Sequence, residues 1–214
     1  MPSDRPLEAV TLDAFGTLLD LVDPVERLRA ALATQGLERD GEAIERAFAA
    51  EVAHYVPRSL EGKDEPSLAA LRRDCAAVFL RELGAALDPA DFAPAFVAAL
   101  EFRLLPGTAG ALDRLRAAGL ALACVANWDY TLPEHLARAG VADRFATVVT
   151  SAQAEAAKPD PAIFRVALAR LGVEPGRALH VGDDEADRAG ALAAGLSFAP
   201  PPLATLPRRL GLEG

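Results

Sequence analysis

Short apolar runs that alternate with helical patterns are the feature that most constrains how this chain can fold. The runs cover residues 9–13, 121–126, 146–150, 178–181 and 196–199. From residue 121 onward, stretches with helical periodicity such as "TLPEHLARAG" and "DPAIFRVALARLG" separate them. Short strands that alternate with helices are typical of parallel sheets with right-handed crossovers. The sequence therefore predicts a doubly wound, Rossmann-like α/β core built on a parallel sheet.

The segment between the first two runs has a different pattern. Its fragments "DPVE" and "DPAD" each place Asp at a helix N-cap and Pro at the first helical position, and long periodic stretches such as "SLAALRRDCAAVFLREL" follow. No strand signal interrupts these stretches. We therefore expect residues 22–104 to form a smaller all-helical domain. Residues 1–21 and 105–214 would then form the core domain.

The composition excludes several classes of partner. The 214 residues carry a formal net charge of −9, which gives no electrostatic help to the binding of nucleic acid or of an anionic membrane. No segment has the roughly 18 consecutive apolar residues that a membrane helix needs, and the N-terminus lacks the pattern of a signal peptide. We expect a cytoplasmic monomer or homodimer that binds neither nucleic acid nor membrane.

Polar residues follow the apolar runs at the points where the predicted strands end. Asp13 ends the first run, Asn127 and Lys158 follow the second and third, and the fourth leads into Asp183 and Asp187. Because the carboxyl ends of parallel strands line one crevice, these side chains should converge there. Carboxylates gathered in a crevice repel each other unless a cation joins them, and their hard oxygens suit Mg²⁺. The sequence therefore predicts a magnesium site at this edge.

A cation and backbone amides are expected beside these carboxylates. Lys158 is one of only two lysines among 22 basic residues, which suggests a required point charge facing Asp13 and an anionic substrate. The amides around residues 15–16 and 126–127 precede predicted helices and could bind anionic oxygens. Both observations also have a purely structural explanation. Lys158 could be a solvated loop residue, and the acids after residue 182 could simply mark a helix start, where negative charge is favoured.

Four segments in order resemble the motifs of the haloacid dehalogenase superfamily: "LDAFGT", "VANWD", "AKPDP" and "VGDDEAD". The helical insertion directly after the first segment resembles the cap domain of that family, and the resemblance covers nearly the whole chain. It implies that Asp13 is a nucleophile that forms a covalent aspartyl intermediate, which water then hydrolyses. Lys158 would orient Asp13 and stabilise charge on the transferred group.

The resemblance also implies a full set of site residues. The catalytic residues would be Asp13 and Lys158. Mg²⁺ would be held by Asp13, Asp183, Asp187 and the backbone carbonyl of Phe15. A small phosphorylated molecule would be bound by Gly16, Thr17, Ala126, Asn127 and Lys158.

Two positions depart from the pattern of the phosphatases in this superfamily. Phe15 stands where those enzymes have a second aspartate that protonates the leaving oxygen, and Ala126 stands where they have Ser or Thr. An aromatic residue at the first position resembles the 2-haloacid dehalogenases, which have tyrosine there and use no metal, although they lack the acidic fourth motif. We therefore expect a Mg²⁺-dependent phosphatase with an impaired proton shuttle. The alternatives are a 2-haloacid dehalogenase and a non-catalytic member that binds phosphate or a partner.

Overall fold

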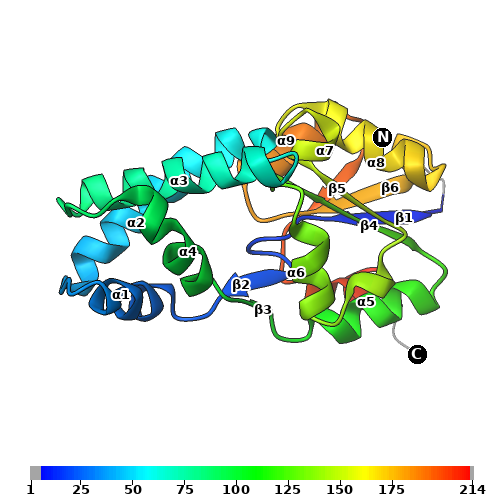
Figure 1. The fold of residues 1–214 in the computed structure, drawn as a ribbon. Coiled ribbons are helices and arrows are strands. Elements are labelled where there is room, and N and C mark those ends of the chain that lie inside the picture. Colours follow the sequence, from blue (N-terminus) through cyan, green and yellow to red (C-terminus); the bar gives the residue numbers. More distant parts are fainter. Residues whose placement is uncertain (1–5, 213–214) are drawn as a thin grey trace.

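A five-stranded parallel sheet forms the centre of the computed structural model, which describes residues 6–212 (Figure 1). The spatial order of the strands is β5-β4-β1-β6-β7. Their bounds are Ala9–Leu12 for β1, Ala121–Ala126 for β4, Thr147–Thr150 for β5, Ala178–Val181 for β6 and Ser197–Ala199 for β7. Every neighbouring pair is parallel. The predicted parallel α/β sheet is confirmed.

The central strand β1 carries its carboxyl end to the middle of the sheet edge. All four of its residues are buried, because helices cover both faces. Leu12 pairs with Cys124 on one side and with Val181 on the other. The Asp13 amide then donates to the Val181 carbonyl at 2.9 Å, so Asp13 continues the ladder by one bond. This register fixes Asp13 at the carboxyl edge, between β4 and β6.

Helices pack on both faces of the sheet. The bounds of these helices are Thr108–Ala117 (α5), Leu132–Arg138 (α6), Ser151–Ala154 (α7), Pro161–Leu171 (α8), Glu185–Ala193 (α9) and Leu206–Arg209 (α10). Short 3₁₀ turns cover Ala142–Arg144, Pro175–Arg177 and Leu203–Thr205. One apolar layer joins the sheet to α5, α6 and α10, and a second joins it to α8 and α9. Figure 1 shows α8 and α9 above the sheet and α5 below it.

Four further helices build a separate apolar cluster. They are α1 (Pro24–Thr34), α2 (Gly41–Arg58), α3 (Glu65–Glu82) and α4 (Pro89–Ala99), and the 3₁₀ turn Ser59–Glu61 links α2 to α3. The fully buried rings of Phe79, Phe92 and Phe96 pack against one another at the centre of this cluster. We call these four helices the helical unit. Among the described residues, no helix combines the length and apolar character of a membrane-spanning segment.

The helical unit joins the sheet through two antiparallel strands. Strand β2 (Leu19–Leu21) pairs with β3 (Phe102–Leu104). We expected no strand between residues 22 and 104, and β3 is too short to produce a recognisable alternation. The two-stranded sheet lies between the helical unit and the five-stranded sheet in Figure 1. The division of the chain into two domains stays a prediction.

Candidate active site

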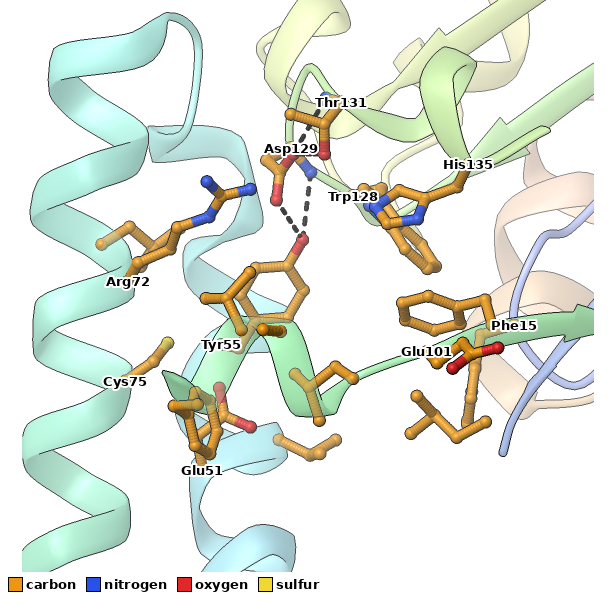
Figure 2. Close-up of a pocket in the computed structure, with 18 of the residues that line it drawn as sticks. Phe15, Glu51, Tyr55, Arg72, Cys75, Glu101, Trp128, Asp129, Thr131 and His135 are labelled. Carbon is orange, nitrogen blue, oxygen red and sulfur yellow. Dashed lines mark hydrogen bonds between the residues drawn. The ribbon is translucent and has the colours of Figure 1, made fainter. Parts of the chain in front are cut away.

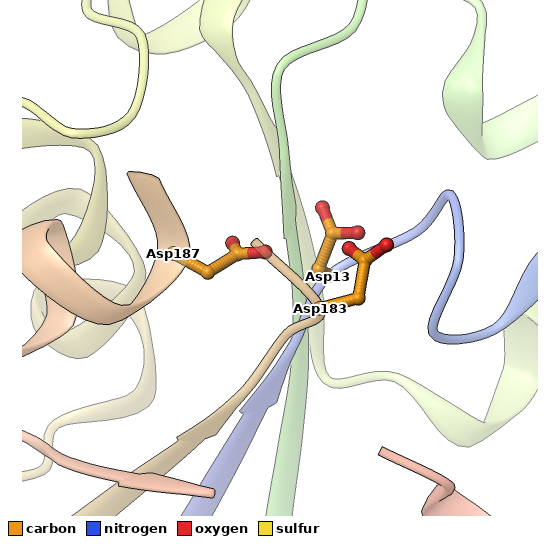
Figure 3. A group of neighbouring side chains, drawn as sticks. All are labelled: Asp13, Asp183 and Asp187. Carbon is orange, nitrogen blue, oxygen red and sulfur yellow. The ribbon is translucent and has the colours of Figure 1, made fainter. Parts of the chain in front are cut away.

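Three carboxylates meet at the carboxyl edge of the sheet (Figure 3). Asp13 follows β1, Asp183 follows β6, and Asp187 lies in the first turn of α9. One carboxylate oxygen from each of the three lies within 4.8 Å of the others. Asp13 and Asp187 are buried, whereas Asp183 is exposed. The structure thus brings together three acids that the sequence separates by up to 174 positions.

The ammonium group of Lys158 joins two of these acids. Its Nζ donates to Asp13 Oδ1 and, at 2.5 Å, to Asp187 Oδ1. Burial by itself would lower the pKa of Lys158, but the two carboxylates outweigh it and hold that pKa above its ordinary value. Lys158 is 7% exposed, so it is no solvated loop residue. It is a charged group built into the acidic cluster.

The side chain of Asn127 holds the backbone of Lys158. Asn127 Oδ1 accepts from the Lys158 amide at 2.7 Å, and Asn127 Nδ2 donates to the Lys158 carbonyl at 3.0 Å. The sequence predicted that Asn127 binds substrate. In the structure both polar ends of its side chain bind the Lys158 backbone, which makes the side chain a positioning group, and the expected contact of its backbone amide with substrate stays a prediction.

His180 supports Asp187 from inside the sheet. Its Nε2 lies 2.9 Å from Asp187 Oδ1, and its Nδ1 lies 2.8 Å from the hydroxyl of Thr11, its register partner on β1. Burial lowers the pKa of His180, so the neutral ring donates from Nε2 to Asp187 and accepts from Thr11. The register of β1 against β6 reveals the supporting role.

The acidic cluster carries more negative charge than Lys158 neutralises. Burial, together with Asp187 and Asp183, raises the pKa of Asp13 to about 7, although Lys158 opposes the shift. Burial would also raise the pKa of Asp187, but hydrogen bonds from His180 and Lys158 overcome it and lower that pKa to about 2. Asp187 Oδ2 has no hydrogen-bond partner among the described residues. Excess charge and an unpartnered oxygen are features of a cation site.

The loop after β1 makes room for Asp183. Gly16 adopts a left-handed φ of 76°, and a Cβ placed there would overlap the Asp183 carboxylate. We expected the Gly16 amide to bind the substrate. In the structure it donates to the Leu19 carbonyl at 2.9 Å and is therefore not available for that role. Beside it, Thr17 is buried and its hydroxyl has no partner among the described residues.

The two departures from the phosphatase pattern are Phe15, within this loop, and Ala126, at the end of β4. The Phe15 side chain is 46% exposed and forms part of a cavity wall, so no acid occupies the second position after Asp13. Ala126 ends β4 and is 1% exposed, which leaves it without a side-chain group for an anion. Proton transfer to a leaving group therefore has no donor at residue 15.

A cavity of about 790 Å³ lies between the helical unit and the sheet edge (Figure 2). Two residues of its wall link the cavity to the acidic cluster. Phe15 lies two positions after Asp13 in the chain, and Asn127 is hydrogen-bonded to the backbone of Lys158. The polar and aromatic lining also includes Trp128 and Asp129, together with residues that the sequence did not indicate: Glu51, Tyr55, Arg72, Phe102 and His135. A space of this size accommodates a small molecule.

The cavity joins an aromatic wall to a polar one. The rings of Phe102, Trp128 and His135 lie with centroids 5.0–5.4 Å apart. Opposite them, the hydroxyl of Tyr55 on α2 donates to Asp129 Oδ2 at 2.9 Å and accepts from the Asp129 amide at 3.1 Å. These bonds tie the helical unit to the loop after β4.

The fold and the site define a Rossmann-like α/β enzyme with an acidic centre at the carboxyl edge of its sheet. The chain belongs to the haloacid dehalogenase-like hydrolase family, whose family model matches residues 7–195. It is 42% identical over 88 residues to haloacid dehalogenase-like hydrolase domain-containing protein 3 of Mus musculus. That match covers 41% of this chain and 35% of the mouse protein, so the chain spans about a third of the length of this relative.

Two longer matches cover most of both proteins. A phosphoglycolate phosphatase of Nitrosospira multiformis is 32% identical over 200 residues, which are 89% of this chain and 81% of the relative. The structure of an L-2-haloacid dehalogenase from Xanthobacter autotrophicus superposes with a TM-score of 0.68 at 27% identity, over 96% of this chain and 82% of that one. The chain therefore has both phosphatase and dehalogenase relatives within this hydrolase family.

Proposed function

We propose that this protein is a Mg²⁺-dependent phosphatase of a small phosphorylated metabolite, acting through an aspartyl-phosphate at Asp13. The observation that carries the proposal is the cluster of Asp13, Asp183, Asp187 and Lys158, which is largely buried except for Asp183 and whose acids outnumber its cation. A reaction in which Asp13 displaces a leaving group without a metal would not need the Asp183 carboxylate in this position. Keeping three carboxylates together without a compensating cation is costly.

The residues present fit a divalent cation. Asp187 Oδ2 is buried and unpartnered, Asp13 and Asp183 provide further carboxylate oxygens within reach, and the Phe15 carbonyl is the proposed backbone ligand. When bound, Mg²⁺ would neutralise charge on the phosphoryl oxygens. Thr17, with its buried and unpartnered hydroxyl, is proposed to bind the phosphate, together with Lys158.

The residues of the chain then account for the chemistry. An Asp13 oxygen attacks phosphorus, forms the O–P bond and displaces the oxygen of the leaving alcohol. Lys158 holds Asp13 in place and balances negative charge on the transferred group. Water subsequently attacks the aspartyl-phosphate and regenerates Asp13. Because Phe15 cannot donate a proton to the leaving oxygen, we expect turnover about 10²–10⁴-fold below that of a site with an acid there.

A 2-haloacid dehalogenase is the second candidate, and Phe15 is the observation that favours it. Halide leaves without a proton, so the absence of an acid at this position would not slow that reaction. In that case an Asp13 oxygen attacks the halogen-bearing carbon, and halide departs before water hydrolyses the ester. The likeness to the Xanthobacter autotrophicus dehalogenase supports this candidate as well.

Phosphate release from p-nitrophenyl phosphate tests the first candidate, and chloride release from 2-chloropropionate tests the second. Wild-type protein should release phosphate with Mg²⁺ and lose that activity in EDTA. The Asp13→Asn variant, which keeps the size of the side chain, should be inactive. Metal-independent chloride release without phosphate release would favour the dehalogenase. Binding of phosphate without turnover of either substrate would favour a non-catalytic member.

A further inference from the structure

The charged side chains that line the cavity differ in whether they are paired. Three arginines contribute to its wall. Arg27 forms an ion pair with Glu101 at 2.6 Å, and Arg138 forms one with Glu134 at 3.3 Å. Arg72, on α3, is half-buried and makes neither an ion pair nor a hydrogen bond with another described residue. Figure 2 shows its guanidinium extending from α3 into the cavity.

The nearby acids are committed to other partners. Asp129 Oδ2 accepts from Tyr55, and Asp129 Oδ1 accepts from both the amide and the hydroxyl of Thr131. Glu65 accepts from the hydroxyl of Tyr130 at 2.8 Å. These bonds leave Arg72 as the unpaired cation of the cavity wall among the described residues. Its guanidinium retains a planar set of N–H donors without protein acceptors.

We propose that Arg72 is a specificity-determining residue that binds a carboxylate on the leaving group of the substrate. The proposal rests on the proposed phosphatase function, because it places the phosphate at Asp13 and Lys158. The rest of the substrate then extends past Phe15 into the cavity. There the guanidinium of Arg72 donates two parallel hydrogen bonds to the carboxylate.

A carboxylate fits this position better than a second phosphate does. The forked donors of a guanidinium match the two oxygens of a carboxylate, and one negative charge balances the one positive charge of Arg72. Asp129 and Glu65 lie on the same wall, so a dianionic phosphate would meet stronger repulsion. Phe15, together with Phe102 and Trp128 of the aromatic wall, provides an apolar surface for the carbon skeleton between the two anionic groups.

Three phosphate esters separate these possibilities. 3-Phosphoglycerate and glycerol 3-phosphate share a three-carbon skeleton. The first carries a carboxylate where the second carries a hydroxymethyl group. Glycerol 1,3-bisphosphate carries a second phosphate at that position. Wild-type protein should show a kcat/KM at least about tenfold higher for 3-phosphoglycerate than for glycerol 3-phosphate. A ratio near one, or a preference for the bisphosphate, would overturn the proposal.

Variants on one helix supply the matched control. Arg72→Gln should lower the ratio of the two kcat/KM values by about 10- to 100-fold, and Arg72→Lys should restore it in part, because lysine keeps the charge but not the fork. Arg73→Gln, which changes an exposed neighbour outside the cavity lining, should keep the wild-type ratio. Equal ratios in the Arg72→Gln variant and the wild type would refute the role of Arg72.

Two further measurements distinguish failure of this inference from failure of the proposed function. Hydrolysis of p-nitrophenyl phosphate, which has no carboxylate, reports on the phosphatase alone. Calorimetric binding of 3-phosphoglycerate to Asp13→Asn protein reports on Arg72 without turnover. Adding Arg72→Gln to that variant should weaken binding by the same 10- to 100-fold. Unaltered affinity would exclude contact between Arg72 and the carboxylate, whatever the activity.

Discussion

Replacing Phe15 by aspartate tests directly why this site differs from the phosphatase pattern. The change puts a carboxyl group at the second position after Asp13, at a residue that lines the cavity. An alcohol leaves phosphorus far more readily when its oxygen is protonated. General acid catalysis contributes about 10²–10⁴-fold. We expect Phe15→Asp to raise kcat for an alkyl phosphate by a factor in that range.

The structure indicates that the protein tolerates this change. The Phe15 side chain is 46% exposed, so about half of its apolar surface is buried. Full burial of such a side chain is worth about 1.5–3 kcal/mol, so the substitution should cost about 1 kcal/mol of unfolding free energy. Both the gain in rate and the small loss of stability are measurable on the same preparation.

The assay compares two leaving groups and one control variant. p-Nitrophenolate leaves without a proton, so Phe15→Asp should increase its release much less than that of an alkyl phosphate such as glycerol 3-phosphate. The Phe15→Asn variant has a side chain of nearly the same shape as aspartate but without an ionisable group. It should therefore accelerate neither the alkyl phosphate nor p-nitrophenyl phosphate. The reasoning would be refuted if both variants accelerated the alkyl ester equally, because the effect would then arise from removing the ring.

Three other predictions concern charge, metal and packing. Burial raises the pKa of Glu51 from its ordinary 4.5 to about 7, so the folded state binds this proton more tightly than the unfolded state. The stability that it contributes is present below pH 4.5 and lost as the pH rises through 7. The loss is about 3 kcal/mol, and Glu51→Gln should abolish it in urea unfolding at pH 5 and pH 8. Gly16→Ala should push the Asp183 carboxylate out of the cluster and weaken Mg²⁺ binding about 10- to 100-fold by calorimetry; unaltered affinity would remove Asp183 from the metal site. Phe79→Ala should lower the unfolding free energy by about 3–5 kcal/mol in denaturant, since the ring is fully buried in the helical unit; a loss under 1 kcal/mol would contradict that packing.

Local sequence was sufficient to predict the strands of the main sheet. The β4 and β6 segments match the predicted ranges at both ends, and the other three differ by one residue at one end. These strands are buried on both faces, so their apolar runs stand out from the polar loops. Strand β3 could not be predicted in the same way, because its three residues form a strand only through pairing with β2.

The residues of the candidate site likewise divide into those that local sequence indicates and those that only tertiary contacts reveal. Sequence motifs singled out Asp13, Lys158, Asp183 and Asp187, because each follows a strand whose carboxyl end must reach the common edge. The sequence also marked residue 15 as the departure that bears on the reaction. It did not indicate that the Asn127 side chain holds the Lys158 backbone, since these bonds join loops that are 31 positions apart.

The sequence by itself determined the class of fold, the family and the acids of the site, because these depend on periodicity and on residues at strand ends. Tertiary structure alone decided which groups are paired and which stay free. The alignment of β1 with β6 brings Thr11, His180 and Asp187 into one hydrogen-bonded chain. The packing of α3 against α2 and α4 leaves Arg72 facing the cavity without a partner among the described residues. Such contacts join segments far apart in the chain, and no local pattern encodes the distance between them.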